Sequence, residues 1–395
     1  MKRRDFLQLT AAGAALIALP TYAQSKVGST DTVSGLSLPT ERGSVLPTRG
    51  VITKSALPIN SPTHGMRYQT PFRFGMGGTQ IGNIFAPISE AQAQSNLQAA
   101  WDSGVRYFDT SPFYGYGLSE HRLGVFLQKQ NRDDYIVSTK VGRILKASRG
   151  PLPNEGLWTS PLPFDYEYDF SAAGARRSVE DSLQRMGISS IDIVFIHDLS
   201  PDNAELPGTW QDHYKVAQKG AMVELEKMRD EGLIRAWGFG INTPNAAVLA
   251  AESDGPTPDI VLLACQYSLI DHEETLNRTF PALERKGISV VLGTPLSDGF
   301  LGGRSRYHFS PDIPDGAVEK RAQILKIADQ FGIDIRTAAL QFAAAPKIVS
   351  AIVPGSRIAG QVEANAQSMK ISIPAEFWQE LRKQGLISKN APIPA

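Results

Sequence analysis

The stretch SEAQAQSNLQAAWDSGVRYFD, residues 89–109, contains a helix and the strand that follows it, and it indicates how the rest of the chain folds. Ser89 with Gln92 three residues later predicts a capped helix start, because the serine side chain can bind a free backbone N–H of the first turn. Gly104 stands where a glycine ends a helix, and the run Val105–Asp109 follows as a strand. The same order of helix, glycine and strand recurs along the chain.

Eight apolar runs are predicted as strands: Phe72–Gly77, Val105–Asp109, Tyr135–Lys140, Ile191–His197, Ile234–Phe239, Ile260–Gln266, Ser289–Thr294 and Ile348–Val353. Helical patterns alternate with them: Ser89–Asp102, Ser119–Gln128, Ala172–Met186, Val223–Glu231, Pro244–Ala251, Thr279–Arg285, Val318–Phe331 and Ile358–Met369. Strand–helix units repeated over about 300 residues favour an α/β fold, a (β/α)8 TIM barrel formed as a single domain by residues 67–390.

A doubly wound parallel sheet is the alternative fold. The turn GMGGTQ, residues 75–80, follows the first strand, but Gln80 stands where the dinucleotide fingerprint needs its third glycine. No GxxxxGK phosphate loop is found in the chain. The barrel is therefore favoured, and two long excursions beyond strand ends, residues 146–169 and 198–219, are candidate substrate walls.

The first 66 residues are not predicted as part of the barrel. The twin-arginine pattern KRRDFLQ, residues 2–8, precedes an apolar run that ends at Leu19 and is too short to span a bilayer. Residues 1–23 are therefore predicted as a signal peptide cleaved after Ala23, with the twin-arginine machinery as export partner, a periplasmic location and no stable membrane insertion. The alternative is an ordinary amphipathic helix with a basic start. Residues 24–66 are rich in Ser, Thr, Pro and Gly and are predicted as a linker or arm.

The composition gives no support for nucleic-acid binding, an intramolecular disulfide or a catalytic metal. Lys plus Arg number 40 and Asp plus Glu also number 40, so no net charge favours nucleic acid. The single cysteine, Cys265, allows no intramolecular disulfide and is interpreted as a small core residue. The histidines show no HxH or HExxH spacing, so we expect no catalytic metal.

Polar side chains stand at or just beyond the ends of three neighbouring predicted strands: Asp109, Tyr114, Lys140 and His197. A free tyrosine has a pKa of about 10 and is a poor acid near neutrality, but a nearby ammonium favours its ionisation. A carboxylate can hold that ammonium, and an imidazole can bind a carbonyl oxygen. The set therefore suggests proton transfer coupled to hydride transfer at a carbonyl or alcohol carbon. Taken singly, each residue also has an ordinary structural interpretation, such as a helix cap or a packed ring.

Four segments resemble signatures of the aldo-keto reductase family: RYFDTSPFYGYGLSEHRLG (106–124), IVSTKVGR (136–143), SVEDSLQRMGISSIDIVFIHD (178–198) and VPGSRIAGQVEAN (353–365). The matches extend from about Phe74 to Asn365 and fill all four positions of the proton-handling set. The elements YGYGLSE, GFGIN and LLACQYSLID resemble the branch with aldose 1-dehydrogenase, fucose dehydrogenase and pyridoxal dehydrogenase.

This resemblance implies NADP or NAD bound across the barrel mouth without a Rossmann turn. The nicotinamide would lie by Gly77, Thr79, Asp109 and Asn242, with Tyr267 stacked on its ring. The pyrophosphate would meet backbone N–H groups of a loop, formed by Pro295, Leu296, Ser297, Gly299 and Leu301. The adenosine end would meet Gly355, Ser356, Arg357, Gln361 and Asn365. Arg357 could pair with a 2′-phosphate and favour NADP, or it could be a solvated residue at a helix start.

The resemblance further implies oxidoreduction of a small aldehyde or sugar, with Tyr114 as general acid or base. Phe113, Trp158 and Tyr116 could line the substrate pocket, or simply pack. Departures from the family pattern at Ala364, at Gly240 and Ile241, and at Gln266 leave the choice of nucleotide and substrate open. Two alternatives remain: a non-catalytic nicotinamide-binding redox sensor, and a barrel hydrolase or isomerase. Because an exported enzyme has to retain its cofactor, the arm formed by residues 24–66 could cover the site.

Overall fold

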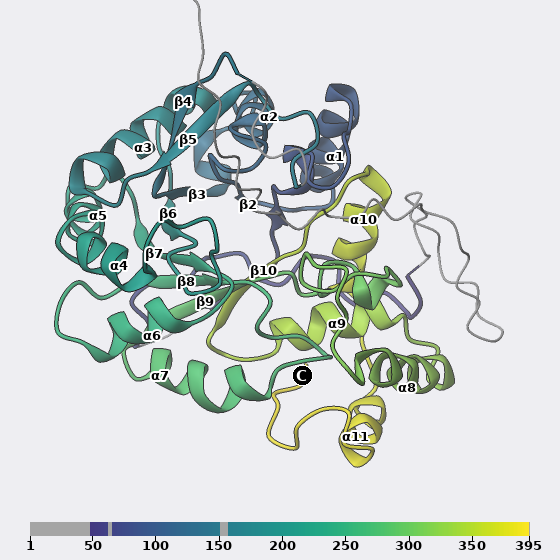
Figure 1. The fold of residues 1–395 in the computed structure, drawn as a ribbon. Coiled ribbons are helices and arrows are strands. Elements are labelled where there is room, and N and C mark those ends of the chain that lie inside the picture. Colours follow the sequence, from purple (N-terminus) through teal and green to yellow (C-terminus); the bar gives the residue numbers. More distant parts are fainter. Residues whose placement is uncertain (1–47, 62–64, 151–156, 395) are drawn as a thin grey trace, which may run out of the picture. The chain divides into compact units, whose positions relative to one another are not determined.

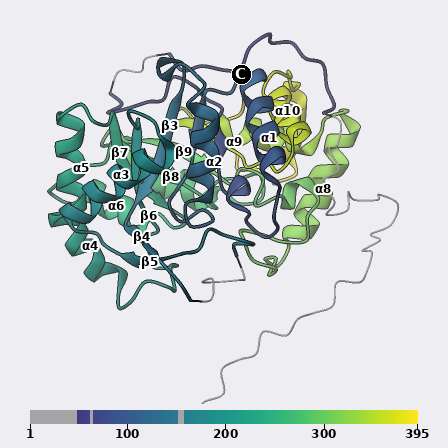
Figure 2. The same cartoon turned by 90° about the horizontal axis from the view of Figure 1, so that it is seen from above.

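The computed structural model describes residues 48–61, 65–150 and 157–394. The predicted signal peptide, residues 1–23, and residues 24–47 of the predicted arm lie outside these ranges. A parallel sheet occupies the centre of the described chain, and helices lie on its outside (Figure 1). The same arrangement is visible from above in Figure 2. Within the described ranges, no helix is both long and apolar enough to cross a membrane.

The central sheet has eight strands in the order β1-β2-β3-β6-β7-β8-β9-β10, and all neighbours are parallel. Their bounds are β1 Met76–Gly77, β2 Tyr107–Asp109, β3 Ile136–Val141, β6 Ile193–His197, β7 Ala236–Ile241, β8 Ile260–Leu263, β9 Ser289–Gly293 and β10 Val349–Val353. Parallel bridges from Phe74 to Ile352 and from Gly77 to Gly355 join the first strand to the last and close the sheet. Each of the eight predicted strands is present, and the predicted barrel is confirmed.

Helices cover the barrel, and those that were predicted begin and end near the predicted residues. They are α1 Glu90–Asp102, α2 Leu118–Leu127, α3 Ala172–Met186, α4 Trp210–Lys219, α5 Ala221–Asp230, α6 Asn245–Glu252, α7 Phe280–Glu284, α8 Ala317–Gln330, α9 Ile335–Ala344, α10 Ala359–Ser368 and α11 Ala375–Lys383. The Ser89 hydroxyl accepts a hydrogen bond from the Gln92 backbone N–H at 3.1 Å, as the capping box predicts. Gly104 has a φ of 93°, a left-handed conformation that favours glycine at this helix end.

The structure contains elements that the sequence pattern did not indicate. Helices α4, α9 and α11 were not predicted. Every residue of α9 is buried, so this helix lacks the polar face on which a periodicity argument depends. The excursion 146–169, predicted as a loop, contributes to an antiparallel hairpin of β4 Arg143–Ala147 and β5 Phe164–Tyr168, in which Arg143 pairs with Tyr168.

Side chains that point into the barrel divide into an apolar middle and a polar end. The apolar middle contains Tyr107, Ile136, Ile193, Phe195, Ala236, Ile260, Leu262, Val291, Ala351 and Val353. Because side chains alternate along a strand, the residue two positions after Tyr107 or Phe195 also faces inward. These positions are Asp109 and His197, and Lys140 stands in the same phase on β3. The carboxyl ends of three adjacent strands therefore carry polar groups into one space.

The described part of the predicted arm runs at the opposite end of the barrel. Asn60 donates hydrogen bonds from Nδ2 to the carbonyl oxygens of Thr70 and Ser350, both at 2.7 Å. Ser350 lies near the start of β10, whereas the polar ends of the strands are their carboxyl ends. Residues 48–61 therefore do not cover the polar end. Residues 24–47 lie outside the described ranges, so for them the expectation stays a prediction.

Candidate active site

Asp109 and Lys140 form a buried ion pair at the ends of β2 and β3. The Lys140 Nζ donates to Asp109 Oδ1 at 3.0 Å and Oδ2 at 2.8 Å, and to the Thr110 carbonyl at 2.8 Å. Ser138 donates a further bond to Asp109 Oδ1 at 2.7 Å. Both charged side chains are almost fully buried, so each charge depends on these partners for stabilisation. The predicted pairing of carboxylate and ammonium is present.

Tyr114 lies beside this pair in the loop after β2. The Lys140 Nζ is 4.6 Å from the centre of the Tyr114 ring, and the His197 ring is 5.8 Å away between centroids. Burial raises the pKa of Tyr114 well above its ordinary value, and the carboxylates of Asp109 and Asp198 raise it further. We expected Lys140 to lower this pKa, but burial and the two carboxylates set the net direction, which is upward. Lys140 directs its hydrogen bonds to Asp109 and Thr110.

His197 ends β6 and is held in one orientation. Its Nδ1 is 3.0 Å from the Ser111 hydroxyl, and that hydroxyl accepts a bond from the Phe113 backbone N–H at 3.1 Å. Burial lowers the pKa of His197 well below its ordinary value, and the cations of Arg143 and Lys140 lower it further. The imidazole is therefore neutral near pH 7, which suits a hydrogen bond to a carbonyl oxygen.

Arg143 and Asp198 belong to the same cluster, although the sequence analysis did not select them. Arg143 Nη1 binds Asp198 Oδ2 at 3.0 Å, and this oxygen is 3.5 Å from His197 Nε2. The Arg143 guanidinium also lies 4.1 Å from the centre of the Phe113 ring. Both residues lie inside the quoted segments 136–143 and 178–198. Their charges next to two strand ends would have allowed the sequence analysis to select them as site residues.

Aromatic side chains form a wall around Tyr114. The Phe113 and Trp158 rings meet edge to face at 5.4 Å, and Trp158 is 5.6 Å from Tyr114 between ring centroids. The Trp158 Nε1 is buried without a hydrogen-bond partner among the residues that the structure describes. Of the three residues predicted to line the substrate pocket, Phe113 and Trp158 therefore lie against the catalytic residues.

Gly77, Gly299 and Gly355, which were predicted to contact the cofactor, stand just beyond or at the carboxyl ends of strands. The bridge between Gly77 and Gly355 brings the end of β1 next to the segment after β10. Gly299 has a φ of 89° in the loop after β9. Within the described ranges, the Ser356 hydroxyl and Gln80 Oε1 are buried without partners. Such unpaired polar atoms are what a bound nucleotide would complete, so the residues present fit an extended NAD(P).

At the predicted adenosine end, Arg357 is partly committed to the protein. Its Nη2 donates to the Ala86 carbonyl at 2.6 Å, and its backbone N–H binds Gln361 Oε1 at 2.8 Å. Asn365 is buried on α10. A second cation, Arg306, is close enough to lower the pKa of Arg357, after the larger effect of burial. Arg306 was not predicted, and its charge is balanced by Asp298, whose Oδ2 is 2.7 Å from Arg306 Nε.

Asn242 and Tyr267 are two further residues that were predicted to contact the nicotinamide. Asn242 follows β7, and its carbonyl accepts a bond from Gln266 Nε2 at 2.7 Å. Tyr267 is 2% exposed, and its ring stacks on Phe342 at 5.3 Å and packs against Phe280. The prediction that Tyr267 stacks on the nicotinamide is therefore wrong, because neighbouring rings in the outer core cover it. In the described ranges, no group of three or more His, Cys, Asp or Glu is arranged to hold a metal ion.

A protonated phenol beside a neutral imidazole can supply a proton to a carbonyl oxygen. In a barrel that also fits an extended dinucleotide, this combination defines a nicotinamide-dependent carbonyl oxidoreductase. The family model of the aldo/keto reductase family matches residues 73–385, and the chain belongs to this family.

Similar proteins agree with this assignment. The chain is 33% identical to D-threo-aldose 1-dehydrogenase of a Pseudomonas species, over 79% of this chain and 94% of that protein. It is 32% identical to pyridoxal 4-dehydrogenase of Microbacterium luteolum, over 80% of this chain and 94% of that protein. An aldo-keto reductase from Bacillus halodurans, solved in its holo form, has a similar fold, with a TM-score of 0.59, 24% identity, and coverage of 79% of this chain and 91% of that one.

The protein is accordingly an NAD(P)-dependent oxidoreductase of aldehydes or sugars. The comparisons give no support to a non-catalytic redox sensor, and they do not indicate a hydrolase or isomerase.

Proposed function

We propose that Tyr114 is the residue that exchanges a proton with the substrate, in aldose C1 oxidation or in the reduction of a small aldehyde. The observation that carries this proposal is the position of its ring, between the Lys140 ammonium and the rings of His197 and Trp158. In this position a substrate oxygen near the phenol is also within reach of an imidazole. Proton donor and orienting group would then act on the same atom.

The four predicted catalytic residues have different roles. In reduction, Tyr114 donates its proton to the carbonyl oxygen, and in oxidation it accepts the proton of the hydroxyl group. Neutral His197 binds the same oxygen and orients it. Asp109 holds Lys140 against the face of the phenol ring. When bound, the nicotinamide supplies or accepts the hydride.

The cofactor is proposed to lie along the ends of β1, β9 and β10. Gly77 and Thr79 would border the nicotinamide, and residues 295–301 would border the pyrophosphate. Arg357 would place positive charge at the adenosine end, which favours NADP over NAD. Phe113 and Trp158 would form the substrate wall, with Trp158 Nε1 as a donor to a substrate hydroxyl.

Tyr114→Phe tests the proposal directly. It removes only the hydroxyl, so we expect kcat to fall by about 100- to 10,000-fold, the usual contribution of general acid–base catalysis. Fluorescence titration with NADPH and NADH should show unchanged cofactor affinity. Tyr214→Phe, in α4, is the control and should retain turnover. If Tyr114→Phe turns over aldoses, pyridoxal or small aldehydes as fast as the unaltered protein, the role of Tyr114 is refuted.

We also propose that the protein is exported by the twin-arginine route and acts in the periplasm. The twin-arginine pattern and the short apolar run in residues 1–23 support this proposal. Cell fractionation should find a mature chain that begins at Gln24, and replacing Arg3 and Arg4 by lysine should leave the uncleaved chain in the cytoplasm. A full-length cytoplasmic protein without these replacements would rule out export.

A further inference from the structure

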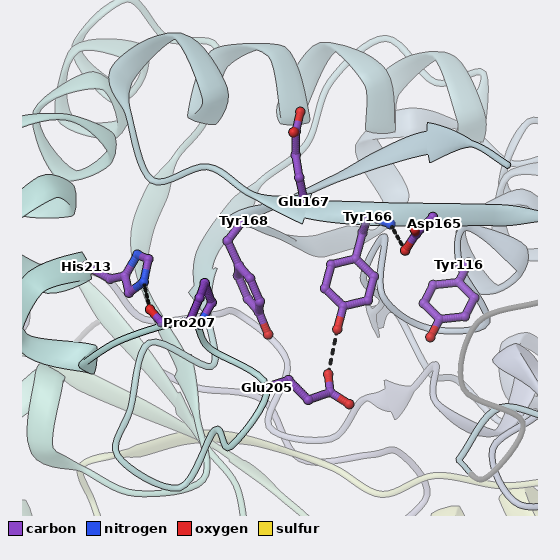
Figure 3. Close-up of a pocket in the computed structure, with 8 residues that line it drawn as sticks. All are labelled: Tyr116, Asp165, Tyr166, Glu167, Tyr168, Glu205, Pro207 and His213. Atoms are coloured by element: carbon purple, nitrogen blue, oxygen red, sulfur yellow. Dashed lines mark hydrogen bonds between the residues drawn. The ribbon is translucent and has the colours of Figure 1, made fainter. Parts of the chain in front are cut away.

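A surface groove lies beside the aromatic wall of the active site (Figure 3). Its volume is about 560 Å³. It is lined by Tyr116, Asp165, Tyr166, Glu167, Tyr168, Glu205, Pro207 and His213. The lining thus combines β5, the turn before α2, the segment after β6, and α4. The sequence analysis expected the excursions 146–169 and 198–219 to form substrate walls, and this groove lies where both excursions meet.

One aromatic layer separates the groove from the catalytic residues. The Phe113 ring lies 5.6 Å from Tyr166 and 6.0 Å from His197 between centroids. The Arg143 guanidinium lies 5.0 Å from the centre of the Tyr168 ring. A ligand in the groove would therefore contact the wall that also borders the substrate carbonyl.

The groove presents phenol hydroxyls in a row. Figure 3 shows the hydroxyls of Tyr116, Tyr166 and Tyr168 turned to the side on which Glu205 lies. Tyr166 donates to Glu205 Oε2 at 2.6 Å, and Tyr168 accepts from Arg143 Nη2 at 3.1 Å. The Tyr116 hydroxyl has no hydrogen-bond partner in the described part of the chain, although its side chain is fully buried. The buried hydroxyls of Tyr214 and Tyr267 also have no partner there, but of these three residues Tyr116 alone lines the groove, where a ligand's polar atom could pair with its hydroxyl.

The backbone of Tyr116 has a sterically unfavourable conformation. Its φ is 52°, in the left-handed region that residues with a side chain rarely adopt. Burial raises the pKa of Tyr116 to about 12, and Glu205 and Asp165 add to this rise. The phenol is therefore protonated near neutrality and can both donate and accept a hydrogen bond.

The charges of the lining favour a neutral ligand with many hydroxyls. The described residues that line the groove include three carboxylates and neither lysine nor arginine, which disfavours an anion. The carboxylates do not converge on one point, because Glu167 turns away from Glu205 and pairs with Lys146. A compact cation therefore has no single binding position. Phenols that donate and carboxylates that accept are the groups that pair with the hydroxyls of a sugar.

We propose that this groove is a subsite for the distal sugar unit of a substrate that is longer than one sugar. This inference rests on the proposed function for the reducing end of that substrate, which would react at Tyr114. The Tyr116 hydroxyl then binds a sugar hydroxyl, and Glu205 accepts from another. The groove thereby extends the substrate range from monosaccharides to disaccharides with a free reducing end.

Titration calorimetry on the full chain tests the subsite without any turnover. Maltose, cellobiose and lactose are the probes, with glucose and galactose as single-sugar references. We expect at least one disaccharide to bind more tightly than its component sugars. Tyr116→Phe should weaken that binding about three- to tenfold, as expected for one lost hydrogen bond, and leave the affinity for the single sugars unchanged.

Two further variants complete the experiment. Tyr166→Phe removes the hydroxyl that competes with the sugar for Glu205, so it should tighten disaccharide binding and provides the test if Tyr116→Phe does not fold. Tyr214→Phe changes a buried tyrosine outside the groove and should have no effect. The subsite is refuted if Tyr116→Phe and Tyr166→Phe bind disaccharides with the same affinity as the Tyr214→Phe control does. It is also refuted if the unaltered protein binds disaccharides no more tightly than single sugars. Such a result would not bear on the role of Tyr114, because that role is tested by turnover.

Discussion

The pKa of Tyr114 shows how one residue's chemistry depends on its immediate neighbours. An isolated ammonium 4.6 Å from the centre of the ring would favour the phenolate. The Asp109 carboxylate, 2.8 Å from the same ammonium, cancels much of that field. Burial then disfavours the charged phenolate, and the net result is a raised pKa. Near neutrality Tyr114 is therefore protonated, which is the form that reduction needs, although the raised pKa also makes it a weaker acid.

This raised pKa predicts opposite pH dependences for the two directions of the reaction. Reduction uses the protonated phenol, so kcat/KM for an aldehyde should be flat from about pH 6 to pH 9 and fall only as pH rises through the Tyr114 pKa. Oxidation uses the phenolate, so kcat/KM for an aldose should rise about tenfold per pH unit over the same range. Initial rates in both directions provide the profiles.

Neutral His197 adds a second requirement to these profiles. Its pKa lies well below the ordinary value of about 6.5. The profile for reduction should therefore show no inflection between about pH 6 and pH 7. An inflection in that range that disappears in His197→Gln would contradict the neutral imidazole.

At the scale of elements, β7 makes room for the catalytic lysine. Gly240 faces the barrel interior, and a Cβ added there would lie 3.2 Å from Lys140 Cε and 3.2 Å from Phe195 Cβ. The strand ladder pairs His197 with Gly240, which places the missing side chain next to the catalytic layer. A strand that lacks a side chain at this position therefore helps to set where Lys140 lies.

Gly240→Ala tests this role of β7. The added methyl group overpacks the interior, so we expect a loss of about 1–3 kcal/mol in the free energy of unfolding and a lower kcat, because Lys140 is displaced. Urea unfolding and steady-state kinetics measure the two effects. Gly150→Ala is the matched control, since its Cβ would meet only the Ser148 hydroxyl at 3.8 Å. Unchanged stability and activity in Gly240→Ala would show that the interior has spare room.

At the scale of the whole described chain, opposite ends of the barrel have different functions. The carboxyl ends of the strands carry the reacting groups, and the amino ends are bound to residues 48–61. Asn60 joins the segment 48–61 to the barrel. Its Nδ2 donates to the carbonyls of Thr70 and Ser350, and its Oδ1 accepts from Arg73 Nη1 at 2.6 Å. Stability and catalysis should therefore respond separately to changes at the two ends.

Asn60→Ala should affect stability alone. It removes three hydrogen bonds, although the Ser350 carbonyl keeps Thr70 Oγ1 and Arg73 keeps the Ala344 carbonyl as partners. We therefore expect the free energy of unfolding to fall by about 2–4 kcal/mol. Because Asn60 lies far from the strand ends that carry Tyr114, kcat should stay unchanged. Thermal unfolding and kinetics measure both quantities, with Asn390→Ala on the surface as control. A large fall in kcat with intact stability would contradict the separation of the two ends.

Local patterns in the sequence determined the strands, their order and the residues that end them. Apolar runs punctuated by glycine predict buried parallel strands, and the alternation of side chains directs Asp109, Lys140 and His197 to one mouth. These inferences need only short-range information, and for that reason they could be read from the chain. Arg143 and Asp198 were readable in the same way, since both follow strand ends.

Only the tertiary structure decided which groups meet, and therefore how they ionise. Lys140 bonds to Asp109 rather than to the Tyr114 hydroxyl, and Tyr267 is covered by Phe342 in the outer core. The hairpin of β4 and β5 and the row of tyrosines in the groove depend on contacts between distant segments. Burial, desolvation and ring packing arise from the three-dimensional surroundings, which no local pattern of residues contains.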